Sequence, residues 1–297
     1  MRRLVFMFLV MMLAAGLTAG CGGSNTDSGK GKADGGGDPG TAAPAPAGVW
    51  ADGHYYAAGE FSDSGWQDVV ALKVENGKIV KAAWNALHRE GGLDKKTSSE
   101  LGFYGMAAKG GAQAEWHEQA AKMEQALIEA QSPEAIAVND DGKTDAVSGV
   151  SVTVGGFLKL AAQALEAGPV EPGPYKDGTY FAEADEFDPK SGWKEHVYIT
   201  VINGNIAAVS WNGTHKDGGT DKVTRSRSGE YGMAANGGAQ AEWHEQAHKA
   251  EQYLLEKQDP LAIPYNPGDG KTDAISGVSI HVDGFVELAA KALEQAK

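Results

Sequence analysis

The chain has 297 residues, of which 26 are basic, 40 are acidic and one is a cysteine. A net charge of −14 makes nucleic acid and anionic lipid headgroups poor partners. A single cysteine excludes a disulfide framework, a thiolate metal cluster and haem attached through paired cysteines. We interpret the acidic balance mainly as an aid to solubility.

The first residues have the order of a secretory signal. Two arginines precede an apolar run, Leu4 to Ala15, and small residues lead to Cys21. The run is too short to span a bilayer comfortably. A cysteine directly after Ala-Gly resembles the lipobox at which bacterial lipoproteins are cleaved and acylated. We therefore expect a signal peptide at 1–20 and a lipidated Cys21 that anchors the mature protein outside the cytoplasm; an ordinary signal with a free thiol is the alternative.

The residues that follow Cys21 predict a tether. Between 22 and 48 the chain contains Gly, Ser, Asp, Lys, Ala and Pro and lacks large apolar residues, so it cannot bury enough surface to offset its chain entropy. We expect residues 21–48 to be a disordered link between the lipid and the rest of the chain.

The remaining sequence is a tandem duplication. Pairing Gly65 with Gly192 and keeping the offset as far as Gln131 and Gln258 gives 39 identities in 67 positions. Units of about 120 residues have the usual size of a domain. We place two domains at 49–168 and 175–297, with a Pro- and Gly-rich connector at 169–174.

Each copy predicts a β-hairpin followed by two helices. An Asn-Gly pair between alternating segments is the strongest short hairpin signal. In the first copy, Trp116, Ala120, Met123 and Leu127 have helical spacing. Strands first and helices later favour an α+β fold with an antiparallel sheet. The expected strands are 68–74 and 79–84, then 195–201 and 206–211; the expected helices are 111–129 and 157–167, then 238–256 and 285–296.

The longest identical block is Gly110 to Ala120, repeated as Gly237 to Ala247. It contains one histidine per copy. In the second copy, His244 and His248 have the i, i+4 spacing of zinc ligands, but the first copy has Ala121 at the matching position. We therefore expect no metal site. We also expect no nucleophile–base pair common to both halves, which argues against an enzyme that turns over a substrate.

A second shared segment follows the hairpin in each copy. It keeps polar and glycine residues, which favours a binding role in a loop where packing constrains little. Tyrosine and methionine side chains could form a wall for a flat aromatic ring, and lysines could meet a phosphate. A loop packed only on itself is the alternative. The residues are Tyr104, Met106 and Lys95 in the first copy, and Tyr231, Met233 and Lys222 in the second.

A heptapeptide recurs near the end of each copy, as Asp145 to Ser151 and as Asp273 to Ser279. It stands before a predicted helix, so its hydroxyls and backbone N–H groups could form a seat for an anion. The alternative is that Ser151 and Ser279 only cap the helix.

These loops resemble the signature sequence of the FMN-binding domain family. Members of that family occur in the C subunit of sodium-pumping NADH:quinone reductase and the G subunit of the Rnf complex. In that family the last hydroxyl of an Asp-Ala-x-Ser-Gly-Ala-Thr loop carries FMN through a phosphoester bond made by a flavin transferase. Here Val-Ser replaces Ala-Thr, and His281 stands where the first copy has Thr153. The resemblance implies cofactor contacts from Asp145, Ser148, Gly149, Ser151, Thr153, Asp273, Ser276, Gly277 and Ser279.

The whole chain resembles the double-FMN-domain surface lipoprotein of flavin-based extracellular electron transfer. This resemblance implies a membrane-anchored electron carrier with one covalent FMN per domain, a membrane redox donor and an extracytoplasmic acceptor. Whether it reduces a terminal acceptor itself stays open. The alternatives are a lipoprotein that binds a small aromatic or anionic ligand non-covalently for uptake or sensing, and a structural surface protein with two adhesive modules.

Overall fold

The computed structural model describes residues 50–297, which belong to one unit of the chain. The expected signal peptide, the lipidated Cys21 and the tether lie outside the described residues. Among the helices of residues 50–297, none is both long enough and apolar enough to cross a membrane.

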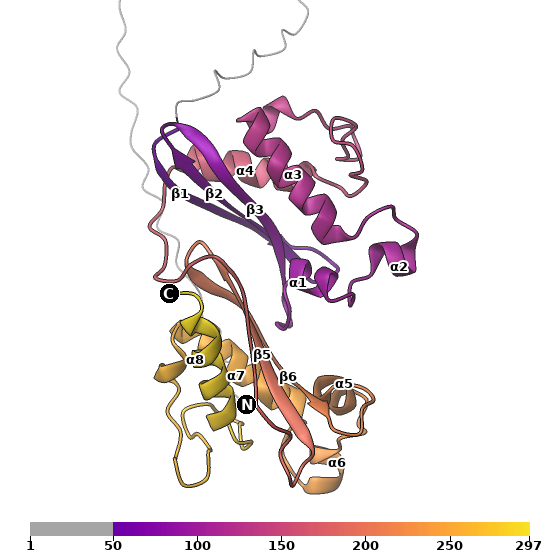
Figure 1. Ribbon diagram of the computed structural model, residues 1–297, viewed down its shortest axis with the longest axis vertical. Coiled ribbons are helices and arrows are strands. Elements are labelled where there is room, and N and C mark those ends of the chain that lie inside the picture. Colours follow the sequence, from indigo (N-terminus) through magenta and orange to yellow (C-terminus); the bar gives the residue numbers. More distant parts are fainter. Residues whose placement is uncertain (1–49) are drawn as a thin grey trace, which may run out of the picture. The chain divides into compact units, whose positions relative to one another are not determined.

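The prediction of an α+β fold with antiparallel sheets is confirmed in both repeats (Figure 1). Each repeat contains one three-stranded antiparallel sheet whose strands are neighbours in chain order. The first sheet consists of β1 (Gly53–Phe61), β2 (Trp66–Glu75) and β3 (Lys78–His88), and the second of β4 (Gly178–Glu183), β5 (Trp193–Ile202) and β6 (Asn205–His215).

The Asn-Gly pairs form the predicted hairpin turns. Asn76 and Gly77 have φ of 54° and 72°, as a two-residue turn that matches the twist of the strands requires. The sequence pattern did not predict β1 and β4 as strands. In β1 only Tyr55 is buried, so the alternation that identifies a strand is weak there.

Helices cover one face of each sheet. The predicted start of the first long helix at residue 111 is wrong, because Glu115 forms a capping box with Glu118 and the helix begins one residue later. Two short helices also stand where a loop was expected. The helices are α1 (Lys95–Glu100), α2 (Met106–Gly110), α3 (Trp116–Ala130), η1 (Pro133–Ala135) and α4 (Gly155–Ala167), then α5 (Lys222–Arg227), α6 (Met233–Gly237), α7 (Trp243–Lys257), η2 (Pro260–Ala262) and α8 (Asp283–Glu294).

The core of the first repeat lies between the sheet and the helices α3 and α4. The inward face of β2 presents Val70, Leu72 and Val74, which share one buried cluster with the apolar stripe of α3. Phe157 of α4 stacks on Trp84 of β3, with ring centroids 4.9 Å apart. The second repeat has the same core, including the stacked pair Trp211 and Phe285 at 4.8 Å.

Truncating Phe157 should destabilise the first repeat. Phe157 is fully buried, so Phe157→Ala removes its packing on Trp84 and leaves a cavity; we expect a loss of about 3–5 kcal/mol in the free energy of unfolding. Phe103→Ala is the matched control, because Phe103 is 63% exposed, and it should cost less than about 0.5 kcal/mol. Urea unfolding followed by near-UV circular dichroism measures both, and equal losses would contradict this account of the core.

Candidate functional site

One cavity in each repeat gathers residues that are far apart in the sequence. The first has a volume of about 940 Å³ and lies between β1, β2, the α1–α2 segment and the start of α4. The second has a volume of about 1160 Å³ and lies between the equivalent elements. Both are large enough for a ligand of cofactor size.

Part of the predicted site lines these cavities. Tyr104, Met106, Ser151 and Thr153 line the first, and Tyr231, Met233 and Ser279 line the second, where His281 replaces the threonine. Residues from the tyrosine–methionine segment and from the heptapeptide loop therefore meet at one place in each repeat.

The rest of the heptapeptide lies outside the cavities. Six predicted residues are exposed and do not line either cavity: Asp145, Ser148, Gly149, Asp273, Ser276 and Gly277. Gly149 and Gly277 have φ of 76° and 74°, a conformation that favours glycine, so their role in the structure is to turn the chain. The cofactor contacts predicted for these six residues therefore stay a prediction, since the residues lie outside the two cavities.

A buried glutamine holds each serine loop against the long helix. Gln119 of α3 is 1% exposed, and its Oε1 accepts hydrogen bonds from Ser151 N at 2.7 Å, Val152 N at 3.1 Å and Ser151 Oγ at 3.3 Å. Gln246 of α7 accepts the same bonds from Ser279 N at 2.7 Å, Ile280 N at 3.3 Å and Ser279 Oγ at 3.2 Å. Sequence analysis missed this residue, although it stands in the longest identical block.

The far end of the glutamine amide fixes its orientation. Gln119 Nε2 donates to Ala114 O at 2.9 Å, and Gln246 Nε2 donates to Ala241 O at 2.8 Å. Because the amide nitrogen has a carbonyl partner, the amide oxygen must face the loop. Each serine is therefore held at the cavity by a rigid helix.

This arrangement corrects both interpretations of the serine loop. The backbone N–H groups of Ser151 and Ser279 are bonded to the glutamines, so they do not offer a seat for an anion. The serines do not cap the following helices either, because the N-cap residues are Val154 and Val282, which make no side-chain capping bond. The remaining feature of each serine in the cavity is its hydroxyl.

A basic residue near each serine was also missed. Lys143 lines the first cavity and Lys271 the second, and both follow a glycine in the turn before the heptapeptide. These lysines are present at equivalent positions and are exposed, so they can approach an anion at either serine.

The aromatic wall of the first cavity surrounds Lys95. Its Nζ lies 5.5 Å from the ring centroid of Trp66, 5.0 Å from that of Tyr104 and 5.0 Å from that of Trp116. Rings at these distances attract a cation. Lys95 therefore lies beside the aromatic wall that was predicted to contact a flat ring, and its positive charge is located there.

The equivalent lysine of the second repeat has a carboxylate partner. Lys222 Nζ lies 2.6 Å from Glu195 Oε1, and Trp211 Nε1 donates to Glu195 Oε2 at 3.1 Å. The first repeat has the shorter Asp68 at the position of Glu195. Among the residues that the structure describes, Lys95 has no ion pair within 4.0 Å, and Trp84 Nε1 has no hydrogen-bond partner.

The environment of Asp68 favours its protonated form. Burial raises the pKa of Asp68 above 3.8, while the charge of Lys95 and the nearby Trp84 indole oppose the shift. The first cavity thus contains an unpaired lysine and a carboxyl group that ionises less readily than usual.

Glu115 positions the methionine of the first cavity. Its carboxylate accepts from the N–H groups of Met106 at 2.7 Å, Ala107 at 3.1 Å and Ala108 at 3.1 Å, which are the first residues of α2. Burial would raise the pKa of Glu115, but the three backbone bonds outweigh it and hold the pKa below 4.5. Glu242 makes the same bonds to the start of α6.

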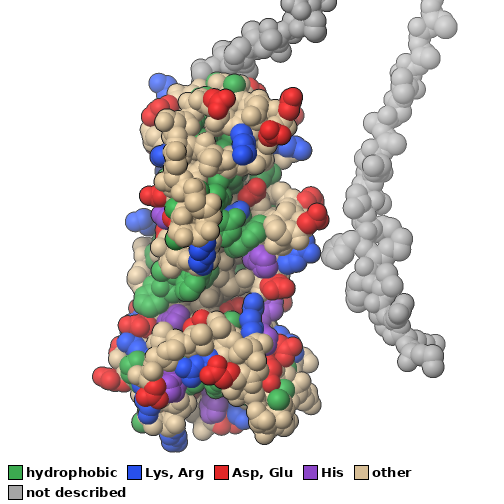
Figure 2. Space-filling view, turned by 90° about the vertical axis from the view of Figure 1, so that its right-hand side faces the viewer, with side chains coloured by type: hydrophobic (Ala, Val, Ile, Leu, Met, Phe, Trp, Pro, Cys, Tyr) green, Lys and Arg blue, Asp and Glu red, His purple; other side chains and the backbone are tan. Residues whose placement is uncertain are grey.

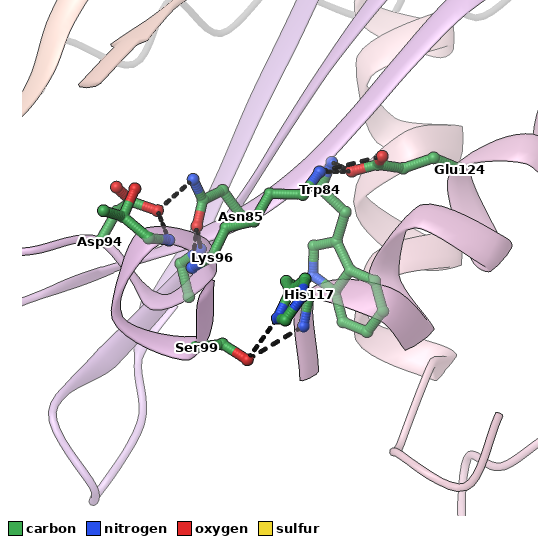
Figure 3. A network of polar contacts seen from close by, with 9 residues as sticks. Trp84, Asn85, Asp94, Lys96, Ser99, His117 and Glu124 are labelled. Carbon is green, nitrogen blue, oxygen red and sulfur yellow. Dashed lines mark hydrogen bonds and ion pairs between the residues drawn. The ribbon is translucent and has the colours of Figure 1, made fainter. Parts of the chain in front are cut away.

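A polar network holds the start of α1 against β3 (Figure 3). Asp94 is the N-cap residue and accepts from Thr97 N at 3.0 Å, while Asn85 Nδ2 donates to the same carboxylate at 2.7 Å. Asn85 Oδ1 in turn accepts from Lys96 N at 3.1 Å. The asparagine after the buried tryptophan of β3 therefore ties α1 to the sheet.

The expectation that no nucleophile–base pair is common to both halves is wrong. Ser99 Oγ lies 2.9 Å from His117 Nδ1 (Figure 3), and in the second repeat Ser226 Oγ lies 2.9 Å from His244 Nδ1. Each serine is buried, and its Oγ also accepts the backbone N–H of its histidine. Burial lowers the pKa of His244, which favours the neutral form of its imidazole. Each pair joins a short helix to a long one.

No group of three or more His, Cys, Asp or Glu side chains suited to a metal ion occurs within residues 50–297. His244 is bonded to Ser226, while His248 Nδ1 lies 3.5 Å from Glu251 Oε2. The i, i+4 histidine pair of the second repeat is therefore engaged with different neighbours.

Comparison with known proteins gives two solved structures. A Clostridium thermocellum protein determined by solution NMR is 62% identical over 40% of this chain and 91% of its own, with a TM-score of 0.33. A Clostridium perfringens protein determined by crystallography is 26% identical over 39% of this chain and 87% of its own, with a TM-score of 0.32. No family model and no curated protein matches the chain. Neither of these matches indicates a function.

The raised pKa of Asp68 should make stability depend on pH. The folded protein keeps this proton to higher pH than the unfolded chain does, so the stabilising contribution is complete below 3.8 and is lost as the pH rises through the folded pKa. Asp68→Asn should flatten the fall in the free energy of unfolding over that interval. The exposed Asp63→Asn variant is the control. Urea titrations at a series of pH values measure the slopes, and identical slopes for Asp68→Asn and the wild type would contradict the assignment.

Proposed function

We propose that this protein is a membrane-anchored flavoprotein electron carrier with one FMN attached covalently to Ser151 and another to Ser279. A lipid on Cys21 would hold it at the extracytoplasmic side of the membrane. The carrier receives electrons from a membrane redox donor and passes them to an extracytoplasmic acceptor. The observation that carries the proposal is the meeting, in each repeat, of the heptapeptide serine with the tyrosine, methionine and lysine of the other shared segment in one cavity.

The residues of the cavities fit FMN. The isoalloxazine ring is flat and aromatic, and Trp66, Tyr104 and Met106 offer a matching wall in the first repeat. The phosphate is an anion, and Lys143 lines the same cavity as the acceptor Ser151. When bound, the flavin supplies the redox chemistry, and the chain holds it and sets its electrostatic surroundings.

Attachment requires the serine hydroxyl to act as a nucleophile toward phosphorus. A flavin transferase would supply the flavin as a phosphoanhydride with a nucleoside monophosphate. The Oγ–P bond forms as the P–O bond of the anhydride breaks, the nucleoside monophosphate leaves with the bridging oxygen, and the serine proton passes to solvent. Gln119 Oε1 lies 3.3 Å from Ser151 Oγ and holds it in a fixed position. A covalent link suits an exported protein because a dissociated cofactor would diffuse away.

A second candidate is non-covalent capture of a small aromatic anion for uptake or sensing. It is favoured by the lysines and aromatic residues of the cavities, whose contacts do not depend on an ester at the serine. Purified protein distinguishes the two functions, because only the covalent flavin survives denaturation.

The test is the intact mass of denatured full-length protein from a host with an active flavin transferase. We expect two FMN increments in the wild type, one in Ser151→Ala, one in Ser279→Ala and none in the double variant. Ser148→Ala and Ser276→Ala are matched controls, because these serines belong to the same loops but do not line the cavities. They should retain both increments.

Two outcomes would contradict the proposal. Wild-type protein without a covalent increment would exclude covalent attachment, and yellow colour that is lost on denaturation would favour the second candidate. Loss of flavin from Ser148→Ala rather than from Ser151→Ala would place the acceptor elsewhere in the loop.

A further inference from the structure

The two cavities differ in charge although the two repeats do not. Residues 49–168 contain 10 basic and 17 acidic residues, and residues 175–297 contain 12 and 19, so each repeat has a net charge of −7. On the face shown in Figure 2, acidic and basic side chains are interspersed. The first cavity is lined by three basic and two acidic residues, a net charge of +1, and the second by four and seven, a net charge of −3. The difference is therefore local to the cavities.

The helix after the serine loop accounts for part of this difference. Lys159 of α4 lines the first cavity, and the equivalent residue of α8 in the second is Glu287. Asp283 also stands in the first turn of α8, where α4 has Gly155. A carboxylate there offsets the positive end of the helix that would otherwise face the cavity.

The longer β4–β5 segment adds further negative charge. It contributes Asp185, Glu186, Asp188 and Lys190 to the lining of the second cavity, whereas the shorter β1–β2 segment contributes the uncharged Ser62 and Ser64. Lys291 also lines the second cavity. Its Nζ lies 3.3 Å from Asp185 Oδ1, so the charges of Lys291 and Asp185 compensate each other.

The lysines beside the aromatic walls also make the first cavity more positive than the second. Lys222 lies 2.6 Å from Glu195, which largely cancels its charge inside the second cavity. Lys95 of the first cavity has no such partner within 4.0 Å among the described residues, where the shorter Asp68 stands in place of Glu195. The positive charge of Lys95 therefore acts on a ligand more fully than that of Lys222 does.

We propose that the first cavity holds its flavin at a higher reduction potential than the second. The inference rests on the proposed function. Reduction adds negative charge to the isoalloxazine ring, so a positive cavity stabilises the reduced form and a negative cavity destabilises it. The order of the potentials sets the direction of transfer: each electron lost by the flavin of the second repeat is gained by that of the first. The membrane donor replaces it, and the acceptor removes it.

Single-site variants allow each potential to be measured in the full-length protein. Flavinylated Ser279→Ala retains the flavin of the first repeat, and flavinylated Ser151→Ala retains that of the second. Spectroelectrochemical titration near neutral pH should give the higher midpoint for Ser279→Ala. Wild-type protein should show two waves at these positions.

Charge exchange at the equivalent helix position tests the cause. Adding Lys159→Glu to Ser279→Ala should lower its midpoint, and adding Glu287→Lys to Ser151→Ala should raise its midpoint, so the gap should narrow. Lys78→Glu is the control, because Lys78 is exposed in the hairpin and does not line either cavity. It should leave both midpoints unchanged.

The outcomes separate this inference from the function on which it rests. Equal midpoints, the reverse order, or midpoints that do not respond to the exchange at 159 and 287 would overturn the inference alone, because covalent flavin would still be present. Absence of covalent flavin from both single-site variants, seen by mass, would overturn the proposed function and the inference together.

Discussion

The candidate site depends on one buried amide oxygen in each repeat. Gln119 Oε1 accepts two backbone N–H groups and the serine hydroxyl of a loop that is 32 residues further along the chain. Gln246 does the same in the second repeat. If the loop moved away, the buried amide would lose several hydrogen bonds and their free energy. These bonds therefore stabilise the position of the loop at the cavity. This contact joins the serine loop to a long helix that packs in the core.

The identical block around this glutamine has a structural explanation for most of its members. Trp116 packs in the core and lines the first cavity, Glu115 caps α2, His117 is bonded to Ser99, and Glu118 completes the capping box. The block therefore connects the short helices that carry the tyrosine and methionine to the helix that anchors the serine. Two segments of each cavity are organised by one stretch of sequence, which accounts for its retention in both copies.

Local patterns predicted the fold well where each pattern has one physical meaning. The Asn-Gly turns require positive φ at both positions, and the apolar stripe of α3 has one buried face, so both were predictable. The glutamine was not, because its role depends on a loop that only the folded chain brings near. The sequence also did not predict that Lys222 forms an ion pair and Lys95 does not. The difference follows from the one methylene by which Glu195 is longer than Asp68. Duplication identifies shared residues, whereas their contacts require the structure.

The most direct measurement is a peptide map of flavin in the Gln119→Leu variant, prepared from a host with an active flavin transferase. Leucine has a similar size but cannot accept the hydrogen bonds that hold Ser151, while the second repeat remains intact as an internal control. The account predicts that flavin on the peptide with Ser151 falls several-fold while flavin on the peptide with Ser279 is unchanged. Equal occupancy of both peptides, or flavin on neither, would contradict the claim that a helix glutamine holds each serine in place as the acceptor.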